Sequence, residues 1–286
     1  MSTHPTDSGP STVCVRHPDR PTGLACTRCG RPACPDCLRN ASVGMHCVDC
    51  VNEAARTTRT ARTAGGAPVR RDTRPVVVAT LIVLNLVVFA LTAVSAGSIG
   101  SNYASTLFDA LSLVPTAVAD GQWWRLVTSG FLHIGPLHIA FNMIALWVIG
   151  RDVELALGRL RFTVVYLAAL LGGSTAVMLF GGALTPVAGA SGAVFGLMGA
   201  LAVLLRRLKL SPGPALTTIA INVVLSFVIP GLSVLGHLGG LVVGALVAAG
   251  FLYGPGRSRV PAGFAIAGVV VVVLLRLVGV RDLALG

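Results

Sequence analysis

Seven apolar stretches, each close to the length needed to cross a lipid bilayer, occupy most of the chain after residue 75. A membrane-spanning helix needs about 20 mostly apolar residues. The expected spans are approximately 76–96, 134–153, 163–181, 189–206, 214–230, 233–253 and 261–280. The sequence therefore predicts an all-α polytopic membrane protein, a helical bundle with seven transmembrane helices.

The composition of the chain excludes an ordinary soluble domain. Of its 286 residues 54% are hydrophobic and 12% are charged, whereas soluble domains are about 45–50% apolar and about 25% charged. The stretches that are not apolar lie mainly before residue 76, so we expect a membrane part with a polar N-terminal appendage.

The positive charge of the chain predicts its orientation. The net charge is +11, but residues 1–55 carry five Arg and five acidic residues and are neutral. If the N-terminus is cytoplasmic, 19 of the 22 Lys and Arg residues lie on the cytoplasmic side, as the positive-inside rule requires. We expect a multi-pass protein of the cell membrane, embedded in the lipid bilayer, with its N-terminus in the cytoplasm and its C-terminus outside. Because the polar appendage is neutral, no nucleic-acid partner is expected.

Shifts in composition divide the chain into five regions. Because Met1–Pro10 is polar and does not read as a signal peptide, we expect the N-terminal regions to stay in the cytosol. The expected regions are a disordered tail at 1–13, a zinc-binding domain at 14–50, a basic linker at 51–75, a membrane core at 76–255 and an additional C-terminal transmembrane helix at 256–286.

All seven cysteines lie between Cys14 and Cys50. In a reducing compartment such a cluster favours metal binding over disulfides. Together with His17 the cysteines form four pairs separated by two residues, a spacing that lets both side chains of a pair reach one tetrahedral ion. The eight candidate ligands are Cys14, His17, Cys26, Cys29, Cys34, Cys37, Cys47 and Cys50. They predict two closed, structural Zn²⁺ sites in a segment too small to fold without them.

The spacing of these pairs resembles B-box-type zinc fingers, whose two sites are interleaved. That resemblance groups the first and third pairs on one ion and the second and fourth pairs on the other. Sequential grouping is nearly as compatible with the spacing, and His46 could replace Cys47. We expect the zinc domain to have a cytosolic partner, which the sequence does not identify.

Two residues inside apolar spans form a possible nucleophile and base. Ser191 lies in Gly189-Ala190-Ser191-Gly192 at the head of one span, and His237 lies near the start of another. Serine is unreactive until a base takes its proton, and ionisable residues in lipid are functional candidates by default. Both lie roughly 5–10 Å below the outer surface at the rise of a helix. They predict a Ser–His dyad, because no carboxylate lies in a span near His237.

Neighbouring residues extend this candidate site. His138 and Asn142 are one turn apart on a third span and share a face, so both could donate to a developing oxyanion. Phe195, one turn after Ser191, is placed to pack against the base. We expect His133 to make a structural hydrogen bond.

Glycines predict how the two spans approach one another. Gly236, Gly240 and Gly244 recur every four residues on the face of the span that carries His237, which allows close helix packing. The same spacing is common in purely structural helix contacts. In either case, we expect this face to press against the span of Ser191.

Four motifs in this order resemble the rhomboid intramembrane serine proteases over roughly residues 76–255. They are Trp124-Arg125, His138-Ile-Ala-Phe-Asn142, Gly189-Ala190-Ser191-Gly192 and Gly236-His237-Leu-Gly-Gly240. The resemblance implies a six-helix core with Ser191 as nucleophile, His237 as base, and an oxyanion site made by His138, Asn142 and the backbone N–H of Ser191. It implies single-span membrane proteins as substrates, no cofactor for catalysis, and structural roles for Arg125 and Glu154.

A second hypothesis is a catalytically silent rhomboid-like protein that binds transmembrane helices. Such members typically lose the serine or the histidine, and this chain has both. A third, a nucleic-acid-binding zinc finger on a membrane anchor, fits poorly with the neutral segment 1–55.

Overall fold

The computed structural model describes residues 12–57, 63–64, 74–229, 231–254 and 259–285. The chain divides into two compact units, residues 1–60 and 61–286. This boundary falls within the segment predicted as a linker, 51–75. Residues 1–11 of the predicted tail lie outside the described residues.

The N-terminal unit is built from two short antiparallel strand pairs, β1 with β2 and β3 with β4. Its elements are β1 (Val13–Cys14), β2 (His17–Pro21), the 3₁₀ helix η1 (Pro35–Cys37), β3 (Leu38–Asn40), β4 (Met45–Cys47) and α1 (Val48–Thr57). Six cysteines with Ala33 and Leu38 make up its buried interior. Helix α1 continues beyond Cys50 to Thr57, so the folded unit is longer than the predicted 14–50.

The second unit contains one helix for each of the seven predicted spans. These helices are α2 (Val76–Ala96), α6 (Gly135–Leu157), α7 (Arg159–Phe180), α8 (Ser191–Arg207), α9 (Gly213–Val228), α10 (Val234–Tyr253) and α11 (Arg259–Leu285). The predicted boundaries agree with the observed ones to within a few residues, because each apolar run ends at polar or glycine residues that favour a turn.

Not all seven helices are long and apolar enough to cross a membrane alone. Among the described residues four meet that condition, α2, α7, α10 and α11. A fifth is α6 if it is joined to Arg125–Phe131, from which it bends by 93°. Helices α8 and α9 have 17 and 16 residues, short of the usual span length. The all-helical multi-pass class is therefore correct, and the count of seven spans stays a prediction.

The connection between α2 and α6 consists of short helices. They are η2 (Asn102–Ala104), α3 (Thr106–Leu111), α4 (Pro115–Ala119), α5 (Arg125–Thr128) and η3 (Ser129–Phe131). The buried Arg125 side chain ties them together, because it donates to the carbonyls of Asp109 and Ser112 and to the side chain of Gln122. This geometry is the structural role expected of Arg125.

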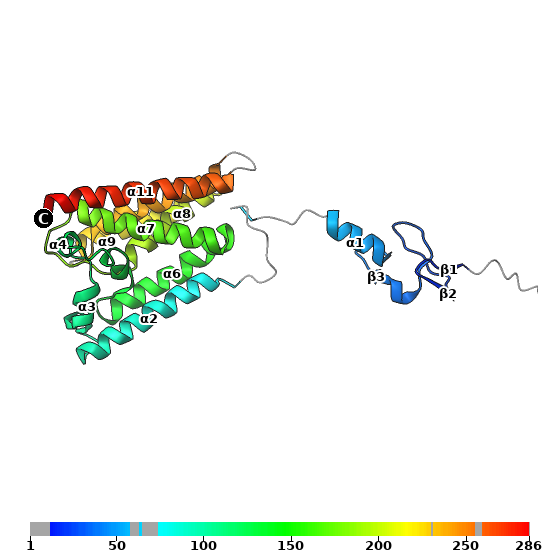
Figure 1. Ribbon diagram of the computed structural model, residues 1–286, viewed down its shortest axis with the longest axis horizontal. Helices are drawn as coiled ribbons and strands as arrows, with labels where there is room; N and C mark the ends of the chain where they lie inside the picture. Colours follow the sequence, from blue (N-terminus) through cyan, green and yellow to red (C-terminus); the bar gives the residue numbers. More distant parts are fainter. Residues whose placement is uncertain (1–11, 58–62, 65–73, 230, 255–258, 286) are drawn as a thin grey trace, which may run out of the picture. The chain divides into compact units, whose positions relative to one another are not determined.

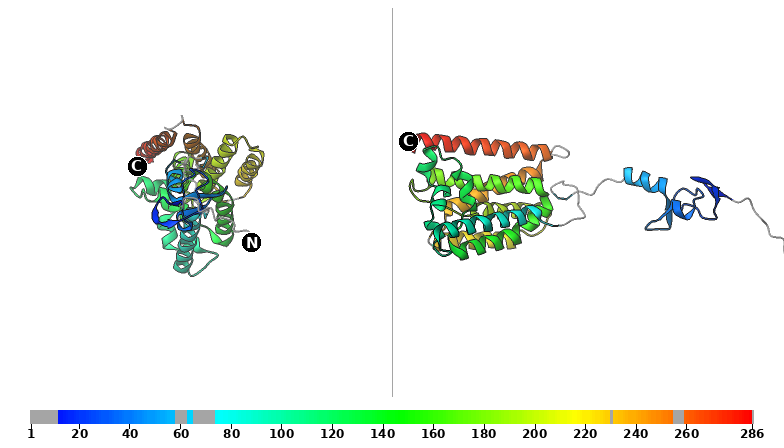
Figure 2. Two further views of the ribbon diagram at one scale, coloured as in Figure 1. Left: turned by 90° about the vertical axis from the view of Figure 1, so that its right-hand side faces the viewer. Right: turned by 60° about the horizontal axis from the view of Figure 1, so that its bottom comes forward.

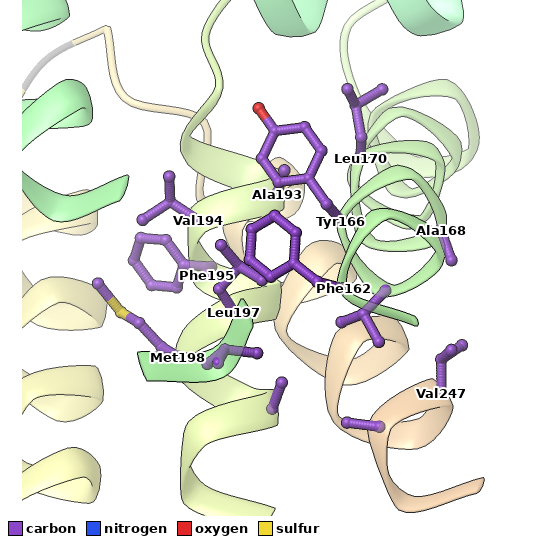
Figure 3. Close-up of a cluster of buried hydrophobic side chains, with 14 of the residues drawn as sticks. Phe162, Tyr166, Ala168, Leu170, Ala193, Val194, Phe195, Leu197, Met198 and Val247 are labelled. Carbon is purple, nitrogen blue, oxygen red and sulfur yellow. The ribbon is translucent and has the colours of Figure 1, made fainter. Parts of the chain in front are cut away.

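The centre of the bundle is made by α7, α8 and α10, which pack closely on one another. Helix α2 lies beside α6, and α11 runs along α7 and α10 at one edge of the bundle (Figures 1 and 2). Helix α9 packs on α8 and α10. Figure 3 shows Phe162 and Tyr166, both from α7, directed toward Phe195 and Leu197 of α8.

A carboxylate from α6 caps the start of α2. The two oxygens of Glu154 accept the backbone N–H groups of Val77 and Val78 at 3.0 and 2.8 Å, and the side chain is 2% exposed. The first N–H groups of a helix lack intrahelical partners and carry a partial positive charge, so a carboxylate stabilises them. This contact gives Glu154 the structural role expected of it.

Candidate active site

Ser191 and His237 are hydrogen-bonded. Ser191 begins α8, and His237 lies in the first turn of α10 with 4% of its surface exposed. Ser191 Oγ lies 2.8 Å from His237 Nε2. Two residues 46 positions apart are thus within reach for proton transfer.

Glycines bring the two helices close enough for this contact. A Cβ built on Gly240 of α10 would overlap the carbonyl oxygen of Gly192, and one on Gly244 would overlap the backbone of Gly196 in α8. The close approach predicted for Gly240 and Gly244 is therefore confirmed, and any larger residue at Gly240 would push α10 away from Ser191.

The imidazole of His237 is held on two sides. The Phe195 ring stacks on it with the centroids 4.2 Å apart and the planes 7° apart, as expected from the sequence. The second contact was not expected: Ser226 Oγ of α9 lies 2.6 Å from His237 Nδ1. The only sequence signal for Ser226 is a polar residue within an apolar run.

The start of α8 can stabilise negative charge beside Ser191. The first helical hydrogen bond joins Val194 N–H to the carbonyl of Ala190. The N–H groups of Ser191, Gly192 and Ala193 therefore have no partner within the helix and carry the partial positive charge of its N-terminus. Such groups can receive an oxyanion.

His138 faces the same place. Its Nδ1 accepts the backbone N–H of Ile134 at 3.2 Å, so in the neutral ring the proton is on Nε2. A Cβ built on Gly189 would lie 3.0 Å from His138 Nε2 and 3.4 Å from Ser191 Oγ. Gly189 has φ +137°, a conformation that side chains disfavour. Glycine therefore keeps the space between the hydroxyl and the Nε2–H donor open.

Asn142 lies one turn along α6 from His138 and is buried. Its amide donates to the His138 carbonyl at 2.9 Å, and the second amide proton is left for another acceptor. Asn142 is not among the described residues that line the cavity beside Ser191.

A cavity opens beside Ser191. Its lining includes Leu113, Ser129, Gly130, His138, Gly189 and Ser191. The loop before α8 is fixed over it by paired hydrogen bonds between Leu113 and Val187 and by the Gly189 N–H to the Ser129 carbonyl. The cavity leaves open space next to the Ser191 hydroxyl.

His133 differs from its prediction. Its ring is fully buried and packs edge-on against His138 at 5.1 Å between centroids. Neither ring nitrogen has a hydrogen-bond partner of acceptable geometry among the described residues. The ring therefore does not supply the expected structural hydrogen bond, but the backbone carbonyl of His133 accepts the side-chain amide of Asn102 at 2.7 Å.

The N-terminal unit holds two clusters of metal-type ligands. The first is Cys14, His17, Cys34 and Cys37, and the second is Cys26, Cys29, Cys47 and Cys50. Within each cluster the ligand atoms lie within 4.8 Å of one another. This is the interleaved grouping that the B-box resemblance implies, rather than the sequential one. Among the described residues His46 belongs to neither cluster.

The distances in these clusters fit a tetrahedral ion. Zn–S bonds of about 2.3 Å and Zn–N bonds of about 2.05 Å place tetrahedral ligand atoms about 3.8 Å apart for S···S and about 3.6 Å for S···N. His17 Nδ1 lies 3.8, 3.4 and 3.3 Å from the sulfurs of Cys14, Cys34 and Cys37. Cys29 Sγ lies 3.8 Å from Cys47 Sγ. Each cluster could therefore hold one metal ion.

The local electrostatics favour the thiolate, the form that binds metal, at some of these cysteines and disfavour it at others. Hydrogen bonding to the backbone of Cys34 lowers the pKa of Cys14 to about 6. Burial raises the pKa of Cys26, but backbone hydrogen bonding led by Cys47 brings it down to about 6. The neighbouring Cys29 thiol raises the pKa of Cys50 to about 12. In such a group, the negative charge of one thiolate disfavours deprotonation of the next thiol unless a cation lies between them. A bound metal ion would supply that positive charge.

The fold and these contacts define a multi-pass helical membrane protein that carries a serine–histidine pair within its bundle. The Rhomboid domain model matches residues 120–254, a range that contains Arg125, His138, Ser191 and His237. The chain belongs to the rhomboid family.

Curated relatives support this placement. The chain is 37% identical over 188 residues to the rhomboid protease GluP of Bacillus subtilis, covering 64% of this chain and 36% of that protein. It is 33% identical over 135 residues to the putative rhomboid protease YdcA of the same organism, covering 46% of this chain and 68% of YdcA. It is 26% identical over 216 residues to the rhomboid protease AarA of Providencia stuartii, covering 63% of this chain and 74% of AarA. The chain thus spans about a third of GluP and about two thirds of YdcA.

Proposed function

We propose that this protein is an intramembrane serine endopeptidase that cleaves transmembrane-helix substrates with Ser191 and His237. The observation that carries the proposal is the 2.8 Å contact between Ser191 Oγ and His237 Nε2 at the head of α8, beside a cavity. The relatives GluP and AarA are rhomboid proteases, which supports the same activity for this chain.

The geometry supports acyl transfer through two steps. In the first, Ser191 Oγ attacks the scissile carbonyl carbon while its proton passes to His237 Nε2, and the carbonyl oxygen becomes an oxyanion. The His138 Nε2–H, the Ser191 backbone N–H and, after a side-chain rotation, Asn142 are the proposed donors to that oxygen. His237 then protonates the leaving amide nitrogen, the C–N bond breaks, and the substrate remains as an ester on Ser191.

In the second step water completes the hydrolysis. His237 Nε2 takes a proton from water, the resulting hydroxide attacks the ester carbonyl, and the proton returns to Ser191 Oγ as the C–O bond breaks. The products are a carboxylic acid and an amine, and the dyad is regenerated.

We further propose that cleavage takes place near the outer membrane face, with the N-terminus cytoplasmic and the C-terminus outside. The support is the distribution of Lys and Arg and the position of Ser191 at the first residue of its helix. The proposed substrates are single-span membrane proteins whose helices unwind at small or helix-breaking residues, because a helical peptide bond is already hydrogen-bonded and sterically shielded.

For the N-terminal unit we propose two structural Zn²⁺ ions, one in each cysteine cluster. Support comes from the four-ligand sets and their near-tetrahedral distances. A bound ion would hold together a unit whose buried interior is mainly cysteine. We propose that this unit docks a cytosolic partner.

The test is cleavage of a single-span reporter by the purified full chain in detergent. The wild type should release product, and Ser191→Ala should lower kcat by roughly 10⁶-fold, as removal of a serine nucleophile does elsewhere, while leaving the helical content unchanged. Cleavage by Ser191→Ala at the wild-type rate would refute the mechanism.

A fluorophosphonate probe separates the protease from a silent helix-binding protein. Labelling of Ser191 that is lost in His237→Ala supports the enzyme. Absence of both labelling and cleavage in the wild type, with the reporter still retained by the protein, would favour the binding function.

A further inference from the structure

Helix α9 contacts the candidate dyad through one side chain. Ser226 is the only buried residue among the 16 of α9, all of which are described. Its Oγ lies 2.7 Å from the carbonyl of Asn222, four residues earlier, and 2.6 Å from His237 Nδ1. The serine therefore lies between its own helix backbone and the imidazole.

The direction of these two hydrogen bonds can be deduced. A carbonyl only accepts, so the single Ser226 hydroxyl proton is donated to Asn222, and the serine oxygen can only accept from the imidazole. In the neutral ring the proton is then on Nδ1, and Nε2 is left with its lone pair. Nε2 is the atom that faces Ser191 Oγ at 2.8 Å. Ser226 thus favours the tautomer that a general base needs.

Serines in membrane helices commonly bond the carbonyl four residues earlier, and the Asn222 bond alone would need no other explanation. What the Asn222 bond does not explain is that the buried Ser226 hydroxyl also lies 2.6 Å from the buried imidazole of His237. Within the described part of the chain, Ser191 of α8 hydrogen-bonds to the His237 ring and Phe195 of α8 stacks on it, and the titratable group near enough to act on it electrostatically is His138 of α6. Among the described residues, no carboxylate hydrogen-bonds to His237, so Ser226 supplies the Nδ1 acceptor.

We propose that Ser226 is a positioning residue that fixes the tautomer and orientation of His237, in the place a carboxylate holds in a catalytic triad. The inference deepens the proposed protease function and rests on it for its kinetic part. Ser226 acts through His237 and does not touch the reacting bond.

The test compares variants of the full chain in detergent. Ser226→Ala removes the acceptor and should lower kcat by roughly tenfold, a part of the usual general-base contribution, with KM unchanged. Ser226→Cys fills nearly the same volume with a weak acceptor and should behave like Ser226→Ala. Ser226→Thr retains the hydroxyl and should restore kcat to within about twofold of wild type.

A matched control lies on the same helix. Thr218 is exposed and bonds the carbonyl of Pro214 at 3.0 Å in the same manner. Thr218→Ala should leave kcat and KM unchanged, which separates loss of the His237 contact from loss of a helix-backbone bond. A fall in kcat with Thr218→Ala equal to that of Ser226→Ala would overturn the inference.

Nitrogen NMR of isotope-labelled histidine gives a readout independent of cleavage. The His237 signal, assigned by its loss in His237→Ala, should report Nδ1–H in the wild type and in Ser226→Thr, and a mixture of tautomers in Ser226→Ala and Ser226→Cys. An unchanged tautomer in those last two variants would refute the inference. If the wild type cleaves nothing, the protease proposal fails, and this spectrum still decides the role of Ser226.

Discussion

Replacing Gly240 by alanine should inactivate the protein more than it destabilises it. A Cβ at position 240 would meet the carbonyl oxygen of Gly192 and lie 2.6 Å from its carbonyl carbon and 3.1 Å from its Cα. Ordinary contact begins at 3.4 Å. Raising 2.6 Å to 3.4 Å already requires α8 and α10 to separate by at least about 0.8 Å, and the carbonyl oxygen, which lies closer still, requires more. Backbone atoms cannot move aside as a flexible side chain can.

The same displacement acts on the dyad. Ser191 adjoins Gly192, and His237 lies three residues before Gly240, so the Oγ–Nε2 distance would grow from 2.8 Å to about 3.6 Å or more, which is no longer a hydrogen bond. Overpacking of this kind costs about 1–3 kcal/mol of stability, whereas loss of general-base catalysis lowers the rate by about 10²–10⁴-fold.

Reporter cleavage measured beside the thermal unfolding midpoint in detergent tests this prediction. Gly268→Ala in α11 is the control, because a Cβ there has nothing within 4 Å. Its rate should match the wild type. Gly240→Ala with wild-type cleavage would show that α8 and α10 are not held as close as described, and the reasoning would be wrong.

Three further predictions concern other contacts. Glu154→Gln should lower the free energy of unfolding by about 1–2 kcal/mol, because it removes the charge-assisted cap of α2. Asp152→Asn, at an exposed neighbouring position, should leave the free energy of unfolding unchanged. Equal unfolding midpoints for the two variants would count against the cap. Phe195→Leu should lower kcat, because it removes the ring stacked on His237, and such a ring contact stabilises by about 0.5–1.5 kcal/mol beyond the burial of its surface. Phe195→Tyr keeps the ring and should retain activity. Unchanged kcat in the leucine variant would contradict this prediction. Metal analysis should find two Zn²⁺ per chain. Cys26→Ser should lose metal and become sensitive to protease at sites before residue 58. A wild-type protein that contains no metal and still resists protease there would refute the proposed ions.

The parts of the fold that follow from local pattern could be predicted from the sequence. The length of the apolar runs predicted helices α2 and α6 to α11, and the two-residue spacings predicted the eight candidate cysteine and histidine ligands. The contact of Ser191 with His237 was predictable because both lie at the same depth on glycine-rich faces. The grouping of the ligands followed from a resemblance, because spacing alone fits two arrangements.

The contacts that were missed join residues with no local signal. Ser226 looks like an ordinary serine in an apolar helix, since its hydroxyl can be satisfied by its own backbone. Only the packing of α9 on α10 brings it to His237. His133 was expected to find a partner because buried polar groups usually do, and sequence cannot show which way a buried ring turns. The domain boundary predicted at Cys50 falls inside α1 (Val48–Thr57), because the residues after Cys50 show no hydrophobic periodicity in the sequence.

The Glu154 cap has a consequence for how the protein is made. The carboxylate reaches N–H groups 76 and 77 residues earlier in the chain, so α2 leaves the ribosome long before its cap is synthesised. Until α6 has entered the bilayer, the first turn of α2 can be satisfied only by water or lipid headgroups. The cap closes when α6 arrives, so the first helix is finished only by a later one, and a chain stalled between them during biogenesis would expose an uncapped helix end to membrane quality control.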